Sequence, residues 1–422
     1  MKKYIIILAI TIIQFPLFSQ NLISKYKAGT VKLVPDNEYA KTNDWNNVFR
    51  SYYDTLYNQP MGNRKSLVLL PDGSIIVNHA YRDYRTKFSP DGKFEKEFVI
   101  KKAEHKSIKG VINDNTLFTD LDNMGKMTCS DFNGNYKKTL TLNYMTKNII
   151  ALNNGKFAVV GWVIWSDKFR SFISIVDYET NKEKVIWEKF TNRSCSSREK
   201  VIKKRQPFNY KIKLKKGGLI SCTTMPYSKS TGKGIPPQIA TIDNELLVAI
   251  PNTGEIFVYD LEGNQKSKSE IDWQNNIISV EEQKATQQKA IDKYKSYISK
   301  GGEEVQENMD AYKQMFSEME EDLINIKTPL AKPSFSNIIK DSDGNVLFFE
   351  IPEEKNANVF HVWVYNQIGQ FSTKCTFICE DYELNISSNK MVFKDGYIYG
   401  LQTLKETNGN PLRLVKFKLE TN

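Results

Sequence analysis

The stretch 241–264, TIDNELLVAIPNTGEIFVYDLEGN, contains the pattern that decides the fold. Its two apolar runs are Leu246–Ile250 and Ile256–Tyr259. The turn residues that bound these runs are Asp243-Asn244, Asn252–Gly254, Asp260 and Gly263. Gly, Asn and Asp suit tight turns, and short unbroken apolar runs suit strands that are buried on both faces. The stretch therefore predicts two neighbouring middle strands of a stacked β-sheet.

Similar units recur along the chain from residue 66 onward. The first-turn and second-turn residues are 19 positions apart in three units and 25 apart in a fourth: Gly73 and Gly92, Asn115 and Gly134, Asn244 and Gly263, Gly344 and Gly369. Turn, strand, loop, strand and turn at a period of about 40 residues are typical of four-stranded propeller blades. We therefore predict an all-β fold, a six-bladed β-propeller, with seven blades as the alternative.

Two segments bear on how the ring is completed. The last unit ends with LRLVKFKL, which leaves no room for a fourth strand before Asn422. We expect the early strand KAGTVKL (27–33) to supply it, because closure from both termini removes exposed sheet edges. The hairpin 209–227, NYKIKLKKGGLISCTTMPY, breaks the period. We interpret it as an elaboration of the fourth blade, with half of a seventh blade as the alternative.

The segment 279–327 changes from strand to helix periodicity. Ser279 followed by Glu282 fits a capping box, and Gly301-Gly302 divides the segment into two halves. Apolar residues recur at helical spacing in both halves: Ile291, Tyr294, Ile298, Met309, Tyr312, Phe316, Met319 and Leu323. The first half is rich in lysine and the second in glutamate. We predict an inserted α-helical hairpin with complementary charge.

The hairpin's methionines, which include Met309, Met315 and Met319, lie with Phe316 on the apolar stripe. We expect this stripe to pack the two helices together or onto the propeller rim. Methionine-rich faces also suit adaptable partner grooves, so docking of a partner is the alternative.

The N-terminus predicts export. Lys2 and Lys3 precede an apolar run over 4–18, and Ser19-Gln20 then precedes polar Asn21. This is the pattern of a secretory signal peptide over 1–20, followed by a single β-propeller domain over 21–422. No later stretch approaches about 18 apolar residues, so we expect no membrane span after cleavage. The protein is then periplasmic, at the cell surface or extracellular.

Composition weighs against several classes of function. The net charge of +10 comes mostly from lysine rather than arginine, the side chain that reads phosphates and bases, so we expect no nucleic-acid partner. Five cysteines are too few for a disulfide scaffold, although one long-range bridge stays open. Cys375 and Cys379 are too far apart along a strand to pair with each other. GxSxG, GxGxxG and P-loop patterns do not occur.

Several units together resemble a known family. They are PDGSIIV (71–77), NNGKFAVV (153–160), DSDGNVLFF (341–349) and KDGYIYG (394–400), paired with FSPDG, YDLEG and YNQIG. They resemble the six-bladed propellers of the NHL and TolB-like kind that occur in many secreted bacterial proteins of unassigned function. The resemblance implies a fold rather than an activity, because such propellers include binding scaffolds, lyases and lactonases.

Each enzyme class in that family implies a metal site to look for. A lyase of this kind implies a histidine zinc site, but His79, His105 and His361 show no ligand spacing. A lactonase implies carboxylates that converge on the axis to hold calcium. Asp120, Asp122 and Glu350 lie at or near the ends of second strands and are the candidates. We interpret the histidines as ordinary core or surface residues.

Two further motifs have an ordinary structural interpretation. Asp341–Asn345, DSDGN, resembles a calcium loop, but its glycine comes fourth rather than sixth, which favours a β-turn. The basic stretch 203–216, KKRQPFNYKIKLKK, places Lys211, Lys213 and Lys215 on one face of a strand. We expect a solvated face there, with a patch for an anionic polymer or lipid head groups as the alternative.

These observations favour a secreted, non-catalytic binding or interaction module. Its partner or ligand, a protein or a glycan, would bind at a propeller face or at the helical hairpin. The alternative is a metal-dependent lyase or lactonase with its site at the axial channel. We assign no catalytic, cofactor-binding or metal-binding residue and expect no cofactor, since Ca or Zn enters only with the enzyme alternative.

Overall fold

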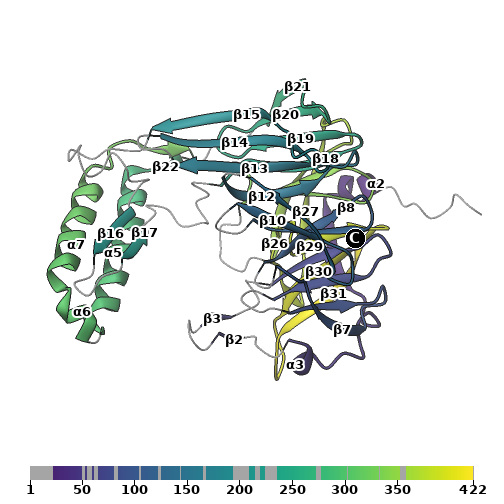
Figure 1. Cartoon of the computed structure of the whole chain (residues 1–422), viewed down its shortest axis with the longest axis horizontal. Helices are drawn as coiled ribbons and strands as arrows, with labels where there is room; N and C mark the ends of the chain where they lie inside the picture. Colours follow the sequence, from purple (N-terminus) through teal and green to yellow (C-terminus); the bar gives the residue numbers. More distant parts are fainter. Residues whose placement is uncertain are drawn as a thin grey trace, which may run out of the picture.

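The computed structural model (Figure 1) describes sixteen segments of the chain. They are residues 22–49, 53–54, 59–60, 65–79, 84–103, 106–121, 125–142, 144–164, 168–192, 209–213, 219–223, 235–271, 277–301, 303–331, 333–351 and 358–421. The predicted signal peptide, His105 and Asp122 lie outside these residues.

The body of the protein is a β-propeller built from antiparallel four-stranded blades. Four blades are separate sheets in simple strand order. Their strands are β4 (Ser66–Leu69), β5 (Ile75–Asn78), β6 (Tyr84–Phe88) and β7 (Phe94–Val99); β8 (Ile108–Ile112), β9 (Thr116–Thr119), β10 (Lys126–Ser130) and β11 (Tyr136–Thr141); β12 (Met145–Ala151), β13 (Lys156–Ile164), β14 (Lys168–Asp177) and β15 (Glu183–Asn192); β18 (Gln238–Ile242), β19 (Glu245–Ile250), β20 (Glu255–Asp260) and β21 (Gln265–Glu270). The opening stretch of the sequence forms β19 and β20, the two middle strands of the last of these blades.

A nine-stranded sheet contains the remaining two four-stranded units. The first unit is β24 (Asn337–Lys340), β25 (Val346–Phe349), β26 (Val359–Tyr365) and β27 (Phe371–Ile378). The second is β29 (Met391–Lys394), β30 (Tyr397–Leu404), β31 (Leu412–Thr421) and β1 (Thr30–Pro35), and the short β28 (Tyr382–Glu383) pairs with β30. Strand β1 runs antiparallel to β31 and parallel to β27, which joins the two units into one sheet. Closure by the early strand is therefore confirmed.

The apolar core lies between neighbouring blades. Six buried clusters each join one four-stranded unit to the next, and together they form a closed cycle around the described part of the molecule. Middle strands are buried on both faces because each blade is covered by two neighbours. The outermost strand β21, QKSKSE, is exposed throughout. The choice between six and seven blades stays a prediction, because 193–208, 214–218 and 224–234 lie outside the described residues.

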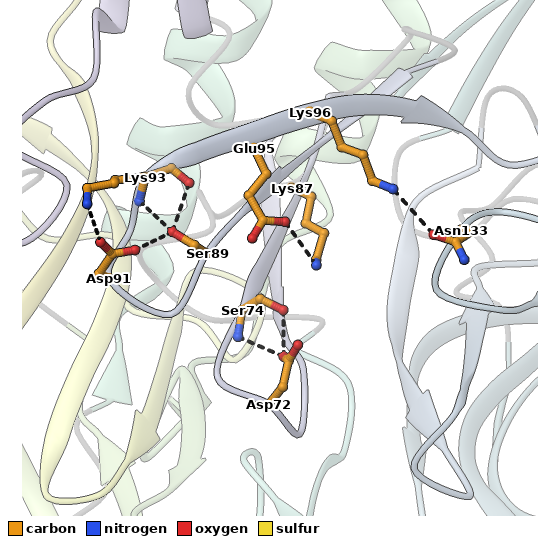
Figure 2. Close-up of polar contacts among 9 residues, drawn as sticks. All are labelled: Asp72, Ser74, Lys87, Ser89, Asp91, Lys93, Glu95, Lys96 and Asn133. Atoms are coloured by element: carbon orange, nitrogen blue, oxygen red, sulfur yellow. Dashed lines mark hydrogen bonds and ion pairs between the residues drawn. The ribbon is translucent and has the colours of Figure 1, made fainter.

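Repeated turns connect the strands at one end of the blades. In the turn 260–264, Asp260 Oδ1 accepts hydrogen bonds from the backbone N–H groups of Glu262 and Asn264 at 3.0 and 2.8 Å, and Gly263 has φ +80°. The same bonds recur in the turns 131–135 and 341–345. Figure 2 shows related turns in the β4–β7 blade, where Asp72 Oδ1 accepts from Ser74 N at 2.9 Å. An Asp side chain that mimics a backbone turn explains why these motifs recur.

The helical hairpin is confirmed as an insertion after β21. Helix α5 (Val280–Ser299) is followed by the short α6 (Glu303–Glu307) and by α7 (Met309–Ile324). Ser279 Oγ accepts from Glu282 N at 3.0 Å, the cap that the sequence predicts. Strands β22 (Ile277–Ile278) and β23 (Leu330–Ala331) pair at its base. We call residues 277–331 the helical arm. No helix in the described ranges is long and apolar enough to cross a membrane.

The remaining short elements precede the first blade or lie beside the arm. Helix α2 (Leu22–Lys27) precedes β1, and α3 (Trp45–Val48), β2 (Tyr53–Asp54) and β3 (Gln59–Pro60) follow it. The hairpin β16 (Asn209–Lys213) and β17 (Leu219–Thr223) forms a sheet of its own. It is bonded to no other described strand, and β16 lies against α7 (Figure 1). This hairpin therefore lies beside the helical arm, and its interpretation as an elaboration of the fourth blade stays a prediction.

Candidate binding face

The propeller has two faces that differ in the length of their connections. In an antiparallel blade, the turn between the first and second strands and the turn between the third and fourth lie at the same end. These tight turns make up the turn face, where α2 and the C-terminus also lie (right side of Figure 1). The opposite end, which we call the loop face, carries the second-to-third connections and the links between blades. The helical arm extends from the loop face (Figure 1).

The loop face is enlarged beyond what the blades need. Strands β13, β14 and β15 have 9, 10 and 10 residues and β12 of the same blade has 7, whereas the strands of the other three separate blades have 4 to 6. At about 3.3 Å per residue, this blade projects past its neighbours. Figure 1 shows β13–β15 reaching toward the base of the helical arm. The additions to the repeat pattern thus gather on one face.

The apolar stripe of the helical arm holds its helices together. Ile291 and Ile298 of α5 form one buried cluster with three residues of α7: Tyr312, Met315 and Met319. The ion pair between Lys295 Nζ and Glu320 Oε1, 2.6 Å apart, joins the basic helix to the acidic one. The methionine stripe therefore packs the arm internally, as expected.

The basic strand β16 lies against α7, which carries several acidic residues. The sequence interpretation had placed Lys211 and Lys213 of this strand on a solvated face. That expectation stays a prediction, because the side chains of β16 are not among those that the structure describes. Residues 203–208 and 214–216, the two ends of the basic stretch, lie outside the described residues.

Two large apolar side chains are exposed near the base of the arm. Ile277 of β22 is 67% exposed, and Ile324 at the end of α7 is 69% exposed. Ile277 belongs to one of the paired strands at the base of the arm, and Ile324 ends the helix that leads back to the other strand. Burying such side chains against a partner would stabilise a complex by about 1.5–3 kcal/mol each. The arm base is therefore the apolar part of the candidate binding face.

A second feature of the loop face is a group of buried basic residues, Lys65, His79, Arg85 and Lys390, which we call the basic cluster. All four side chains are at most 5% exposed. Lys65 Nζ lies 2.9 Å from His79 Nδ1, and His79 Nε2 lies 2.8 Å from Thr86 Oγ1. Arg85 donates to the carbonyls of Ala103 and Lys106, which holds the link to the next blade. Lys65 and Lys390 directly precede β4 and β29, the first strands of two adjacent blades.

Burial changes the charge state within the basic cluster. The pKa of Lys390 falls from 10.5 to about 7, first because burial disfavours the charged amine and second because Lys65 is also cationic. Sequence reasoning missed both lysines. The signal that could have identified them is a lysine directly before the apolar first strand of a blade. It occurs at Lys65 in KSLVLL and at Lys390 in KMVF.

The two described candidates for metal ligands, Asp120 and Glu350, come from different blades, and each has a partner within the protein. Asp120 Oδ2 pairs with Lys109 Nζ at 3.0 Å, and its Oδ1 accepts from the backbone N–H of Leu121. Glu350, in a different blade, accepts a hydrogen bond from Trp363 Nε1 at 2.8 Å. Among the described residues, no group of three or more His, Cys, Asp or Glu is placed to hold a metal ion.

The described histidines serve local contacts. His79 belongs to the basic cluster, and its ring packs near Phe49 and Tyr84, with centroids 6.0 and 4.8 Å away. His361 is exposed on β26, with Nδ1 3.3 Å from Thr376 Oγ1 of β27. The two lie in different blades, and each has its own contacts there.

The motif that resembled a calcium loop is a β-turn. Asp341 Oδ1 accepts from the N–H groups of Asp343 and Asn345, and its Oδ2 accepts from Asn345 Nδ2 at 2.8 Å. Burial raises the pKa of the Asp341 carboxyl, although its hydrogen bonds act in the opposite direction. Asp341 Oδ2 also accepts a hydrogen bond from the Tyr26 hydroxyl of α2 at 3.0 Å.

Three cysteines, Cys129, Cys375 and Cys379, are buried free thiols. Burial raises the pKa of Cys129 and of Cys375 to about 12, which keeps both thiols protonated and unreactive at neutral pH. Cys375 and Cys379 do not pair, as their spacing predicts.

The similarity of this chain to known proteins is confined to solved structures. No family model matches the chain, and no curated protein matches it either. Solved structures that are similar include a member of the DUF4221 family from Bacteroides vulgatus, at 10% identity and a TM-score of 0.46 over 94% of this chain and all of that one. A streptogramin B lyase matches at 11% identity and a TM-score of 0.35, over 85% of this chain and 93% of that one. The WD40 repeats of RRP9 match at 8% identity and a TM-score of 0.40, over 84% of this chain and 79% of that one.

Proposed function

We propose that this chain is an exported six-bladed β-propeller of the NHL and TolB-like kind that binds a protein partner outside the cytoplasm. The loop face is the binding surface, and the helical arm is its main contact element. The N-terminal charge and apolar pattern supports export. In this proposal the turn face is part of the scaffold.

One observation carries the proposal: the structure beyond the repeat pattern gathers on the loop face. The helical arm and the projecting β13–β15 strands both leave the propeller on this side (Figure 1). Insertions of this length are uncommon in compact domains unless they serve function. Rigid scaffolds that display variable connections on one face are a general solution for binding.

The base of the arm favours a protein over a small ligand. Ile277 and Ile324 offer exposed apolar side chains beside polar helix surface. Apolar anchors surrounded by a polar rim are the usual anatomy of protein–protein interfaces. The basic cluster lies beneath the surface and stabilises the shape of the face without contacting the partner directly.

The test is removal of the arm without disturbing the blades. Ile278 pairs with Leu330, so residues 279–329 can be replaced by Asn-Gly, the two-residue turn that closes a β-hairpin. Wild type and this variant are expressed in their native cells, cross-linked there, and the attached proteins are quantified by mass spectrometry. We expect a partner that is enriched with wild type and lost with the arm-deletion variant.

Point variants test the exposed side chains at the base of the arm. Ile277→Ser with Ile324→Ser should reduce recovery of the same partner, whereas Ile368→Ser should not. Ile368 is 62% exposed, comparable to the other two, but lies in the turn 366–370 on the turn face. Equal recovery of partners by wild type, the arm-deletion variant and the point variants would show that the loop face is not the binding surface.

A further inference from the structure

A small pocket of about 150 Å³ lies on the β24–β27 blade, and none of its lining residues belongs to the helical arm. Its polar lining comes from three adjacent strands: Glu350 follows β25, His361 lies on β26, and Lys374 and Thr376 lie on β27. Gly29, in the link between α2 and β1, also lines it. The volume equals that of about five water molecules at roughly 30 Å³ each, so the pocket suits a ligand of a few non-hydrogen atoms.

Pleating places the polar side chains on one face of this blade. Glu350 N donates to the carbonyl of His361 at 3.0 Å, and His361 is the cross-strand partner of Thr376. Two residues further along β26, Trp363 is paired with Lys374. Because side chains alternate between the two faces of a strand, these five side chains all point to the same side of the sheet.

Trp363 holds the two charged groups of the pocket in place. Its indole N–H donates to Glu350 Oε1 at 2.8 Å, and Lys374 Nζ lies over its ring, 3.5 Å from the centroid. The indole side chain is only 7% exposed and packs in the apolar cluster between this blade and the β18–β21 blade. A side chain that is fixed by packing is a rigid support, so both charged groups are fixed relative to each other.

The two charged groups do not pair with each other, although both contact the same ring. In the described ranges, no other carboxylate lies within ion-pair distance of Lys374 Nζ, and no described residue donates to Glu350 Oε2. His361 is exposed, and its Nδ1 lies 3.3 Å from Thr376 Oγ1. With Nδ1 used in this way, Nε2 is the ring nitrogen that can contact a ligand.

We propose that this pocket binds the zwitterionic head of a free α-amino acid. The ammonium group of the ligand binds Glu350, and its carboxylate binds Lys374 and His361. Opposite charges that are fixed near each other but unpaired complement a ligand that carries both charges on one carbon atom. The volume of the pocket favours a small side chain such as that of alanine.

The experiment follows the indole signal of Trp363 by nuclear magnetic resonance. The protein is labelled with ¹⁵N in its tryptophans, the signal is assigned from Trp363→Phe, and L-alanine is titrated at pH 7. Because Trp363 Nε1 donates to Glu350, a ligand that binds this carboxylate should shift the signal saturably. Two charge-assisted contacts of ordinary strength correspond to a Kd on the order of 1 mM.

Two conservative variants separate binding from structure. Glu350→Gln keeps an oxygen that can accept from Trp363 but removes the charge, and Lys374→Met keeps a flexible apolar chain over the ring. Each should raise the Kd for L-alanine at least tenfold. Glu38→Gln and Lys41→Met remove an exposed acid and an exposed lysine that do not line the pocket, and they should leave the Kd unchanged. Unchanged signals from the other tryptophans show that a variant is folded, and either pocket variant alone suffices.

Ligands with a single charge test the zwitterion itself. Acetate and methylammonium, each at the concentration at which L-alanine half-saturates the signal, should give less than a tenth of its shift. The arm-deletion variant should bind L-alanine with the Kd of wild type, because the arm does not line the pocket. This inference therefore stands or fails separately from the proposed protein partner.

Several results would overturn the proposal. One is the absence of a saturable shift of the Trp363 signal with L-alanine. Another is the same Kd in wild type, Glu350→Gln and Lys374→Met. Equal shifts with acetate or methylammonium would show a response to charge alone. Saturation by glucose in place of L-alanine would identify a sugar site and exclude the amino acid.

Discussion

Closure of the propeller by β1 predicts a large effect from a single side chain near the N-terminus. Leu33 is 3% exposed and belongs to the apolar cluster between the last two blades, where β1 pairs with β31. Truncation of a buried leucine to alanine costs about 2–5 kcal/mol in unfolding free energy. We expect Leu33→Ala to cost at least about 3 kcal/mol, because the strand also holds two blade units together.

The matched control is Lys32→Ala, one position earlier on the same strand. Lys32 lies on the opposite face and is half-buried, so its truncation should change the unfolding free energy by no more than about 0.5 kcal/mol. Urea unfolding followed by tryptophan fluorescence gives both values, with the slope m checked for two-state behaviour. Equal unfolding midpoints for the two variants would refute the closing role of β1.

Three other predictions test separate parts of the structure. Between pH 7 and 10.5 the unfolded chain binds a proton at Lys390 that the folded chain does not, so stability rises with pH by up to about 5 kcal/mol. Lys390→Met should lose this contribution in urea unfolding measured from pH 6 to 9. Ser279→Ala should destabilise the arm by about 1 kcal/mol, seen as faster hydrogen exchange in the first turn of α5. Gly134→Ala should lower the melting temperature by several degrees, because its Cβ would lie 2.4 Å from the Val99 carbonyl oxygen.

Each of these predictions has a control. For Lys390, an equal rise in stability with pH in wild type and variant would exclude the lysine as its source. Ser279→Asp should retain the cap, and equal exchange rates for Ala and Asp would argue against capping. Gly396 also has a positive φ but nothing within 4 Å of its Cβ position, so Gly396→Ala measures backbone strain alone. A Gly134→Ala effect no larger than that of Gly396→Ala would contradict the clash.

Local patterns predicted most of the scaffold. The turn Asp260–Asn264 and the apolar runs before it determine their own conformation, because Asp, Asn and Gly satisfy a tight turn through neighbouring backbone groups. The cap at Ser279 is equally local. The position of β1 was also predictable, since the last unit lacked a strand and one strand-like run remained near the N-terminus.

The candidate binding face depended on information that no local pattern contains. The basic cluster joins Lys65 to Lys390 across more than 300 residues, and only ring closure makes them neighbours. Contact between β16 and α7 was likewise missed, because both segments interrupt the repeat and the period of the blades does not apply to them. Asp341 and Asp343 were correctly interpreted as turn residues, but their contacts with α2 come from the other end of the chain.

The sequence by itself determined the β-propeller, the strand that closes it and the inserted helices. These features follow from hydrophobic periodicity and turn chemistry, which act over a few residues. They can therefore be recognised in a short segment without knowledge of the rest of the chain. Only the tertiary structure decided which long connections share a face, which lysines are buried and which carboxylates meet the N-terminal helix. Those properties arise from packing between distant segments, where burial and the proximity of charges change what a side chain can do.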